Sequence, residues 1–92
     1  MEDNVRRQRG MEAVLVYLKA EFRDRDVSQF PERTIKVRDS SAKVLHEMTF
    51  YPQFLDDHAD REVQQVKEWG LVSYMNQAGA TPVWVRSGGL ST

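Results

Sequence analysis

Apolar side chains in the N-terminal third of the chain follow the spacing of one face of a helix. Relative to the first of them they fall at i, i+3, i+4, i+7 and i+11: Met11, Val14, Leu15, Leu18 and Phe22. Because an α-helix turns once in about 3.6 residues, these side chains share a face. The pattern predicts an amphipathic helix that ends near residues 23–26, followed by a connector over residues 27–31.

The next two stretches alternate between apolar and polar residues. Residues 33–38 place Ile35 and Val37 on one side, and residues 43–51 alternate in the same way. A period of two is typical of a strand with one buried face. Residues 39–42, between the two stretches, are of the types that form turns. We therefore expect an antiparallel hairpin.

A second helix is predicted over about residues 55–78. Seven residues fall on one side of a helical wheel: Ala59, Val63, Val66, Gly70, Leu71, Tyr74 and Ala78. Asp56 and Asp57 suit the start of a helix, where its dipole favours negative charge. Gly79, followed by Pro82, suits its end. In an alternative interpretation the helix ends at residues 69–70, and residues 71–75 form a hairpin with residues 83–86.

Residues 83–86 (Val-Trp-Val-Arg) alternate again and predict a third strand. The predicted fold is therefore a single small α+β domain with the order α-β-β-α-β. Its three-stranded antiparallel sheet would carry two helices on one face. We expect the domain to cover residues 1–86, with residues 87–92 as a flexible C-terminal tail.

With both helices on one face, the other face of the sheet would remain open. Strand alternation assigns nine side chains to it: Thr34, Lys36, Arg38, Leu45, Glu47, Thr49, Tyr51, Trp84 and Arg86. Five of these form the candidate contact surface: Lys36, Arg38, Tyr51, Trp84 and Arg86. Trp, Tyr and Arg are enriched among the residues that dominate protein interfaces. Aromatic and basic side chains also suit nucleic acid, and aromatic pairs also stabilise a sheet without any ligand.

Charge bears on the choice between these roles. The 92 residues carry a net charge of −1, which does not favour general attraction to nucleic acid. Residues 33–43 are net basic and residues 53–62 are net acidic. We therefore expect a non-enzymatic binding module that contacts a protein, with a second copy of the chain as one such partner. Nucleic-acid binding is the alternative.

The sequence offers little for catalysis or for a cofactor. It has no cysteine, and none of its serines lies in a G-x-S-x-G setting. His46 falls on the apolar side of its strand, where a hydrogen-bonded neutral ring is expected. His58 and Glu62 share a helix face but lack a third metal ligand. We expect no enzyme activity, no cofactor and no metal site. The absence of cysteine and of a long apolar run suggests a cytoplasmic protein without a membrane segment.

The C-terminal part resembles the end of a winged-helix DNA-binding domain. The resemblance lies in residues 69–72 (Trp-Gly-Leu-Val), 76–79 and 83–90. In that family a helix ends in such a strand, a wing follows, and a return strand leads into Gly-Leu. The resemblance implies that the helix before Gly70 is a recognition helix. That helix begins with the acidic residues of the 53–62 stretch, which would repel phosphate groups.

Overall fold

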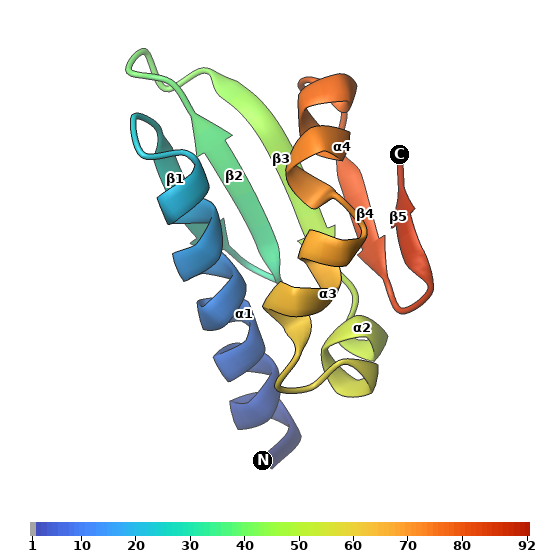
Figure 1. The fold of residues 1–92 in the computed structure, drawn as a ribbon. Coiled ribbons are helices and arrows are strands. Elements are labelled where there is room, and N and C mark those ends of the chain that lie inside the picture. Colours follow the sequence, from blue (N-terminus) through green and yellow to red (C-terminus); the bar gives the residue numbers. More distant parts are fainter. Residues whose placement is uncertain (1) are drawn as a thin grey trace.

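The sheet has five strands, in the spatial order β1–β2–β3–β4–β5 (Figure 1). The computed structural model describes residues 2–92. The strands are β1 (Asp26–Phe30), β2 (Thr34–Arg38), β3 (Val44–Phe50), β4 (Val83–Arg86) and β5 (Gly89–Ser91). Neighbouring strands are antiparallel except β3 and β4, which are parallel. The described part of the chain is thus a small α+β domain with a mixed sheet.

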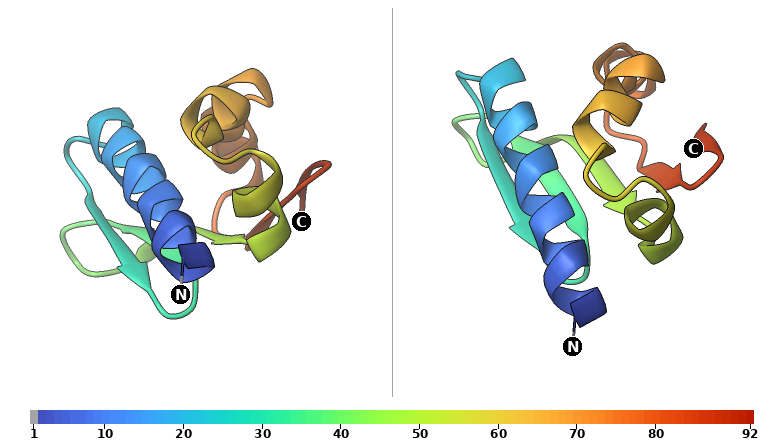
Figure 2. Two further views of the ribbon diagram at one scale, coloured as in Figure 1. Left: turned by 90° about the horizontal axis from the view of Figure 1, so that it is seen from below. Right: turned by 60° about the horizontal axis from the view of Figure 1, so that its bottom comes forward.

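All the helices pack on the same face of this sheet (Figure 2). They are α1 (Glu2–Glu21), α2 (Pro52–Asp57), α3 (Glu62–Glu68) and α4 (Leu71–Ala78). Helix α1 lies at the β1 edge, while α2, α3 and α4 form the crossover between β3 and β4 (Figure 1). Seven strand side chains that face the helices are buried: Val27, Ile35, Val37, Met48, Phe50, Val83 and Val85. Within residues 2–92 no helix or strand covers the opposite face of the sheet, as predicted.

The predicted hairpin and the predicted strand at residues 83–86 are confirmed, but the prediction of a connector over residues 27–31 is wrong. Residues 26–30 form the edge strand β1, which pairs antiparallel with β2. Val27 and Gln29 face the helices, and Phe30 lies on the open face beside Thr34. Only this pairing with β2 makes the short segment a strand, because its own alternation is weak.

The single helix predicted over residues 55–78 is also wrong, because the chain breaks it twice. Asp60 and Gly70 both adopt a left-handed backbone conformation, with φ of 65° and 69°. A right-handed helix cannot continue through such a residue. Helices α3 and α4 nevertheless turn their apolar sides toward the same core, which is why one helical wheel fitted residues of both. The predicted end at Gly79 is confirmed, with φ of 61° there.

The third strand and the tail differ from expectation as well. Strand β4 runs parallel to β3, since a helical crossover returns the chain to the same end of the sheet. The expected flexible tail instead contains β5, which a two-residue turn at residues 87–88 folds back onto β4. Residues 71–78 are helix α4, so the strand and wing implied by the winged-helix resemblance do not form.

Gly10 gives a direct test of how α1 packs on α3. A Cβ atom at this position would lie 2.5 Å from Oε2 of Glu62 and 3.2 Å from Cδ2 of Leu55. Glu62 is buried, so its carboxylate has little room to withdraw. Alanine favours a helix by about 1 kcal/mol over glycine, but overpacking costs about 1–3 kcal/mol. We expect Gly10→Ala to lower the free energy of unfolding, measured by urea denaturation.

A double-mutant cycle supplies the control for this prediction. In a Glu62→Ala background the obstructing carboxylate is absent, so Gly10→Ala should become neutral or stabilising. An equal loss in both backgrounds would contradict the packing explanation.

Candidate interaction surface

The structure places all five predicted contact residues on the open face of the sheet, in two groups. Lys36 and Arg38 come from β2, near the β1 edge. Trp84 and Arg86 come from β4, and Tyr51 directly follows β3. The side chains of Lys36, Arg38, Tyr51 and Trp84 are half-buried, and that of Arg86 is exposed. Alternation along the strands was therefore sufficient to place these residues.

The first group is centred on Phe30, which sequence reasoning missed. The guanidinium carbon of Arg38 lies 4.6 Å from the ring centroid of Phe30, and Nζ of Lys36 lies 5.1 Å from it. Cations at this distance are attracted by the negative face of an aromatic ring. Nε of Arg38 is buried and has no hydrogen-bond partner among residues 2–92. Phe30 thus holds two positive charges over the β1 side of the open face.

The second group is built in the same way around Tyr51. Its ring meets that of Trp84 edge to face, with centroids 6.2 Å apart. The guanidinium of Arg86 lies 4.7 Å from the centroid of the Tyr51 ring. Tyr51 is fixed because its backbone N–H donates to the carbonyl of Val85 at 3.0 Å. Each group therefore joins an anchored aromatic ring to at least one cation.

Small polar side chains occupy the space between the two groups. Phe30 pairs with Thr34, Thr34 with Thr49, and Thr49 with Trp84, so these four residues form one row across the sheet. Hydroxyls of Thr34 and Thr49 are hydrogen-bonded at 2.9 Å. With strands about 4.8 Å apart, Phe30 and Trp84 are separated by roughly 14 Å. The row forms a shallow surface with an aromatic side chain at each end.

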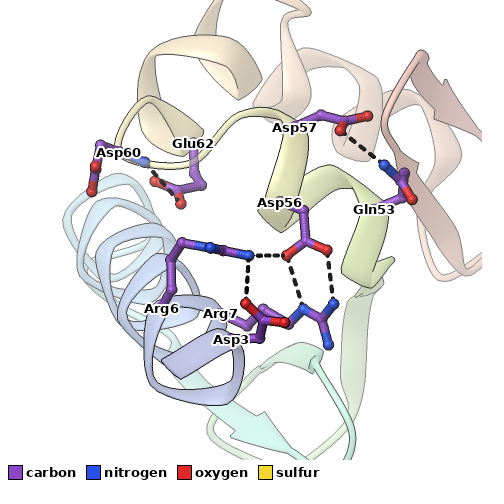
Figure 3. A network of polar contacts seen from close by, with 8 residues as sticks. All are labelled: Asp3, Arg6, Arg7, Gln53, Asp56, Asp57, Asp60 and Glu62. Atoms are coloured by element: carbon purple, nitrogen blue, oxygen red, sulfur yellow. Dashed lines mark hydrogen bonds and ion pairs between the residues drawn. The ribbon is translucent and has the colours of Figure 1, made fainter. Parts of the chain in front are cut away.

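The acidic residues of the 53–62 stretch, with which a second copy could bind this basic surface, mostly make contacts inside the molecule (Figure 3). Asp56 accepts hydrogen bonds from Arg6 and Arg7 of α1. Hydrogen bonds from Ser87 and Gln53 hold the pKa of Asp57 below its usual value. The Glu62 carboxylate is buried and accepts the backbone N–H of Asp60. A second copy would therefore have to displace these contacts in order to use the cluster.

Each of the two histidine rings lies within hydrogen-bond distance of a backbone carbonyl and packs against aromatic side chains. Nδ1 of His46 lies 3.1 Å from the carbonyl oxygen of Gly79, and its ring packs on Phe22. Nε2 of His58 lies 2.9 Å from the carbonyl oxygen of Ser87, and its ring packs against Phe54 and Trp69. Among the described residues, no group of three or more acidic or histidine side chains gathers as metal ligands would.

Comparison with protein-family models, with curated protein sequences and with solved structures found no match. No helix in residues 2–92 has the length and apolar character needed to span a membrane.

Proposed function

We propose that this chain is a binding module that recognises an acidic protein surface through the open face of its sheet. The observation that carries the proposal is the pairing of anchored aromatic rings with cations at both ends of an uncovered face: Arg38 and Lys36 on Phe30, and Arg86 on Tyr51. The aromatic side chains supply area that a partner can remove from water, and the cations orient its carboxylates.

Protein is favoured over nucleic acid for two reasons. The rings of Phe30 and Tyr51 already carry the chain's own cations, so a stacking base would have to displace them, whereas a carboxylate could approach those cations directly. In addition, Glu47 is the cross-strand neighbour of Lys36, which places negative charge in the middle of the face. A phosphate backbone carries a charge at every nucleotide and would meet this carboxylate wherever it crossed the sheet, whereas a protein partner can place an uncharged residue beside Glu47.

An amide NMR titration tests the proposal with two probes, a short glutamate-rich peptide containing leucines and a mixed-sequence oligonucleotide. We expect the peptide to shift the amide signals of Lys36, Arg38, Tyr51 and Trp84. Trp84→Ala and Arg38→Glu should each weaken peptide binding about tenfold or more. The matched control is Arg61→Glu, the same charge change at an exposed residue outside the open face.

Two results would overturn the proposal. Peptide-induced shifts confined to the helices would place binding elsewhere. Oligonucleotide binding at the open face, with affinity falling steeply as salt rises, would make nucleic acid the ligand.

A further inference from the structure

Among residues 2–92, β1 is an edge strand, so its outward backbone groups have no strand partner. The hydrogen bonds of the neighbouring strands show which groups these are. The backbone N–H of Phe50 donates to the carbonyl of Arg33 at 2.9 Å, so this carbonyl points toward β3 and the backbone groups of the next residue, Thr34, point toward β1. Along a strand these groups alternate in direction. Those of Lys36 therefore point toward β1, where its partner in register is Ser28.

The same alternation assigns the outer groups of β1. Ser28 directs its N–H and C=O inward to β2, so Val27 and Gln29 direct theirs outward, beyond the last strand of the sheet. An edge strand of five residues with free donors and acceptors is a template for pairing with another chain.

The flank of α1 beside this edge carries exposed apolar residues. Val5 and Val16 are 64% and 68% exposed and are the large apolar side chains most open to solvent in residues 2–92. Arg9 and Glu12 lie on the same side of the helix, because residues 5, 9, 12 and 16 follow helical spacing. A shallow hollow of about 400 Å³ runs along this flank, lined by Asn4, Val5, Gln8, Arg9 and Glu12. Gln8 marks it as the β1 side, since its amide reaches Gln29.

We propose that the β1 edge and the α1 flank together bind a second copy of the chain. A two-fold axis perpendicular to the sheet, passing beside Ser28, would pair β1 antiparallel with β1 of the second copy. Val27 then lies opposite Gln29 of the second copy. Both residues point their backbone groups outward, so each such pair forms two hydrogen bonds.

The same axis makes the α1 flank complementary to itself. In an antiparallel pair of helices centred between residues 10 and 11, Val5 lies beside Val16 of the second copy and Arg9 beside its Glu12. The position of the axis follows independently from the contact between Gln8 and Gln29. From Gln29, Ser28 lies one strand residue, or about 3.3 Å, closer to the C-terminal end of α1. Along a helix this distance corresponds to about two residues. This places the axis near residue 10.

Opposite charges on the open faces of the two copies would also meet where β1 pairs with β1 of the second copy. Asp26 would lie opposite Phe30 of the second copy, over which Lys36 and Arg38 are held. The two open faces would lie on the same side of a continuous ten-stranded sheet. The interaction surface proposed above would thus be doubled and would remain accessible.

Sedimentation equilibrium over a wide range of protein concentration tests the proposal. We expect the wild-type mass to approach twice the chain mass of 10.7 kDa. Because of the symmetry, Arg9→Glu alone creates two like-charge contacts, and so does Glu12→Arg. Each should weaken dimerisation about tenfold. The double variant Arg9→Glu/Glu12→Arg restores opposite charges and should return the affinity to near the wild-type value.

Two further variants test whether the dimer forms through the β1 edge or through the open face. Gln29→Pro removes one outward N–H without touching the pairing of β1 with β2, and should abolish the dimer. Trp84→Ala alters the open face and should leave the dimer intact. A wild-type mass of 10.7 kDa at every concentration would overturn the proposal. It would also be overturned by a dimer that Trp84→Ala disrupts while Gln29→Pro and the single charge reversals do not.

Discussion

Phe54→Ala should remove a large share of the stability of this protein. The side chain is fully buried at the point where α2, α3 and the end of β3 meet. Its ring centroid lies 5.8 Å from that of Phe50, 5.7 Å from Trp69 and 5.2 Å from His58. Truncation of a buried phenylalanine costs about 3–5 kcal/mol. A domain of this size has a total stability of about 5–14 kcal/mol.

Urea denaturation followed by circular dichroism measures the effect. The matched control is Phe30→Ala, the same truncation on the open face, where the ring is only half-buried. We expect the midpoint of the Phe54→Ala transition to fall far below that of Phe30→Ala. Equal losses would mean that the cluster around Phe54 does not hold the helices to the sheet.

The same cluster bears on the interaction surface. Tyr51 immediately precedes α2, and the carbonyl of Tyr51 accepts the backbone N–H of Phe54 at 3.0 Å. Loosening α2 should therefore also loosen the Tyr51 ring that carries Arg86. The integrity of the open face thus depends on packing on its opposite side.

Residues of the open face were predictable because strand alternation is a local property. Once β2 and β4 were recognised, the sides taken by Lys36, Arg38, Trp84 and Arg86 followed from the period of two. Phe30 was missed because β1 owes its existence to pairing with β2. No local pattern distinguishes Val27–Phe30 from a connector that ends in a proline.

The two breaks in the second helical region could not be predicted from the sequence pattern for a different reason. Apolar positions continue at helical spacing from Ala59 to Ala78, because α3 and α4 bury their apolar sides in the same core. Gly70 carries the only local signal of the second break, and a glycine is also tolerated inside a helix. The parallel pairing of β4 with β3 depends on that crossover, so it could not be inferred from the strand sequences alone.

Replacing Asp56 by asparagine should destabilise the protein at neutral pH, and the difference should vanish in acid. Oδ1 of Asp56 accepts hydrogen bonds from Nη2 of Arg6 and Nε of Arg7, both at 2.9 Å. Oδ2 accepts Nη2 of Arg7 at 2.7 Å. An asparagine keeps the shape but loses the charge and one acceptor, so Arg7 loses the carboxylate it pairs with and Arg6 keeps only Asp3, at 3.2 Å (Figure 3).

The pH dependence follows from the direction of the pKa shift. The hydrogen bonds from Arg7 and Arg6 hold the pKa of Asp56 well below its ordinary value of 3.8. A carboxyl group whose pKa is depressed by folding stabilises the native state above its unfolded pKa. That contribution is lost as the pH falls through the folded pKa. The stability gap between wild type and Asp56→Asn should therefore be constant near neutrality and close below about pH 4.

Thermal unfolding of both proteins between neutral pH and strong acid measures this gap. Asp24→Asn is the matched control, since Asp24 is exposed in the turn after α1 and makes no hydrogen bond or ion pair within residues 2–92. Its stability should follow that of the wild type at every pH. A gap for Asp56→Asn that persists unchanged in strong acid would show that the substitution acts through packing. In that case the two arginines would not be the reason that α2 stays docked on α1.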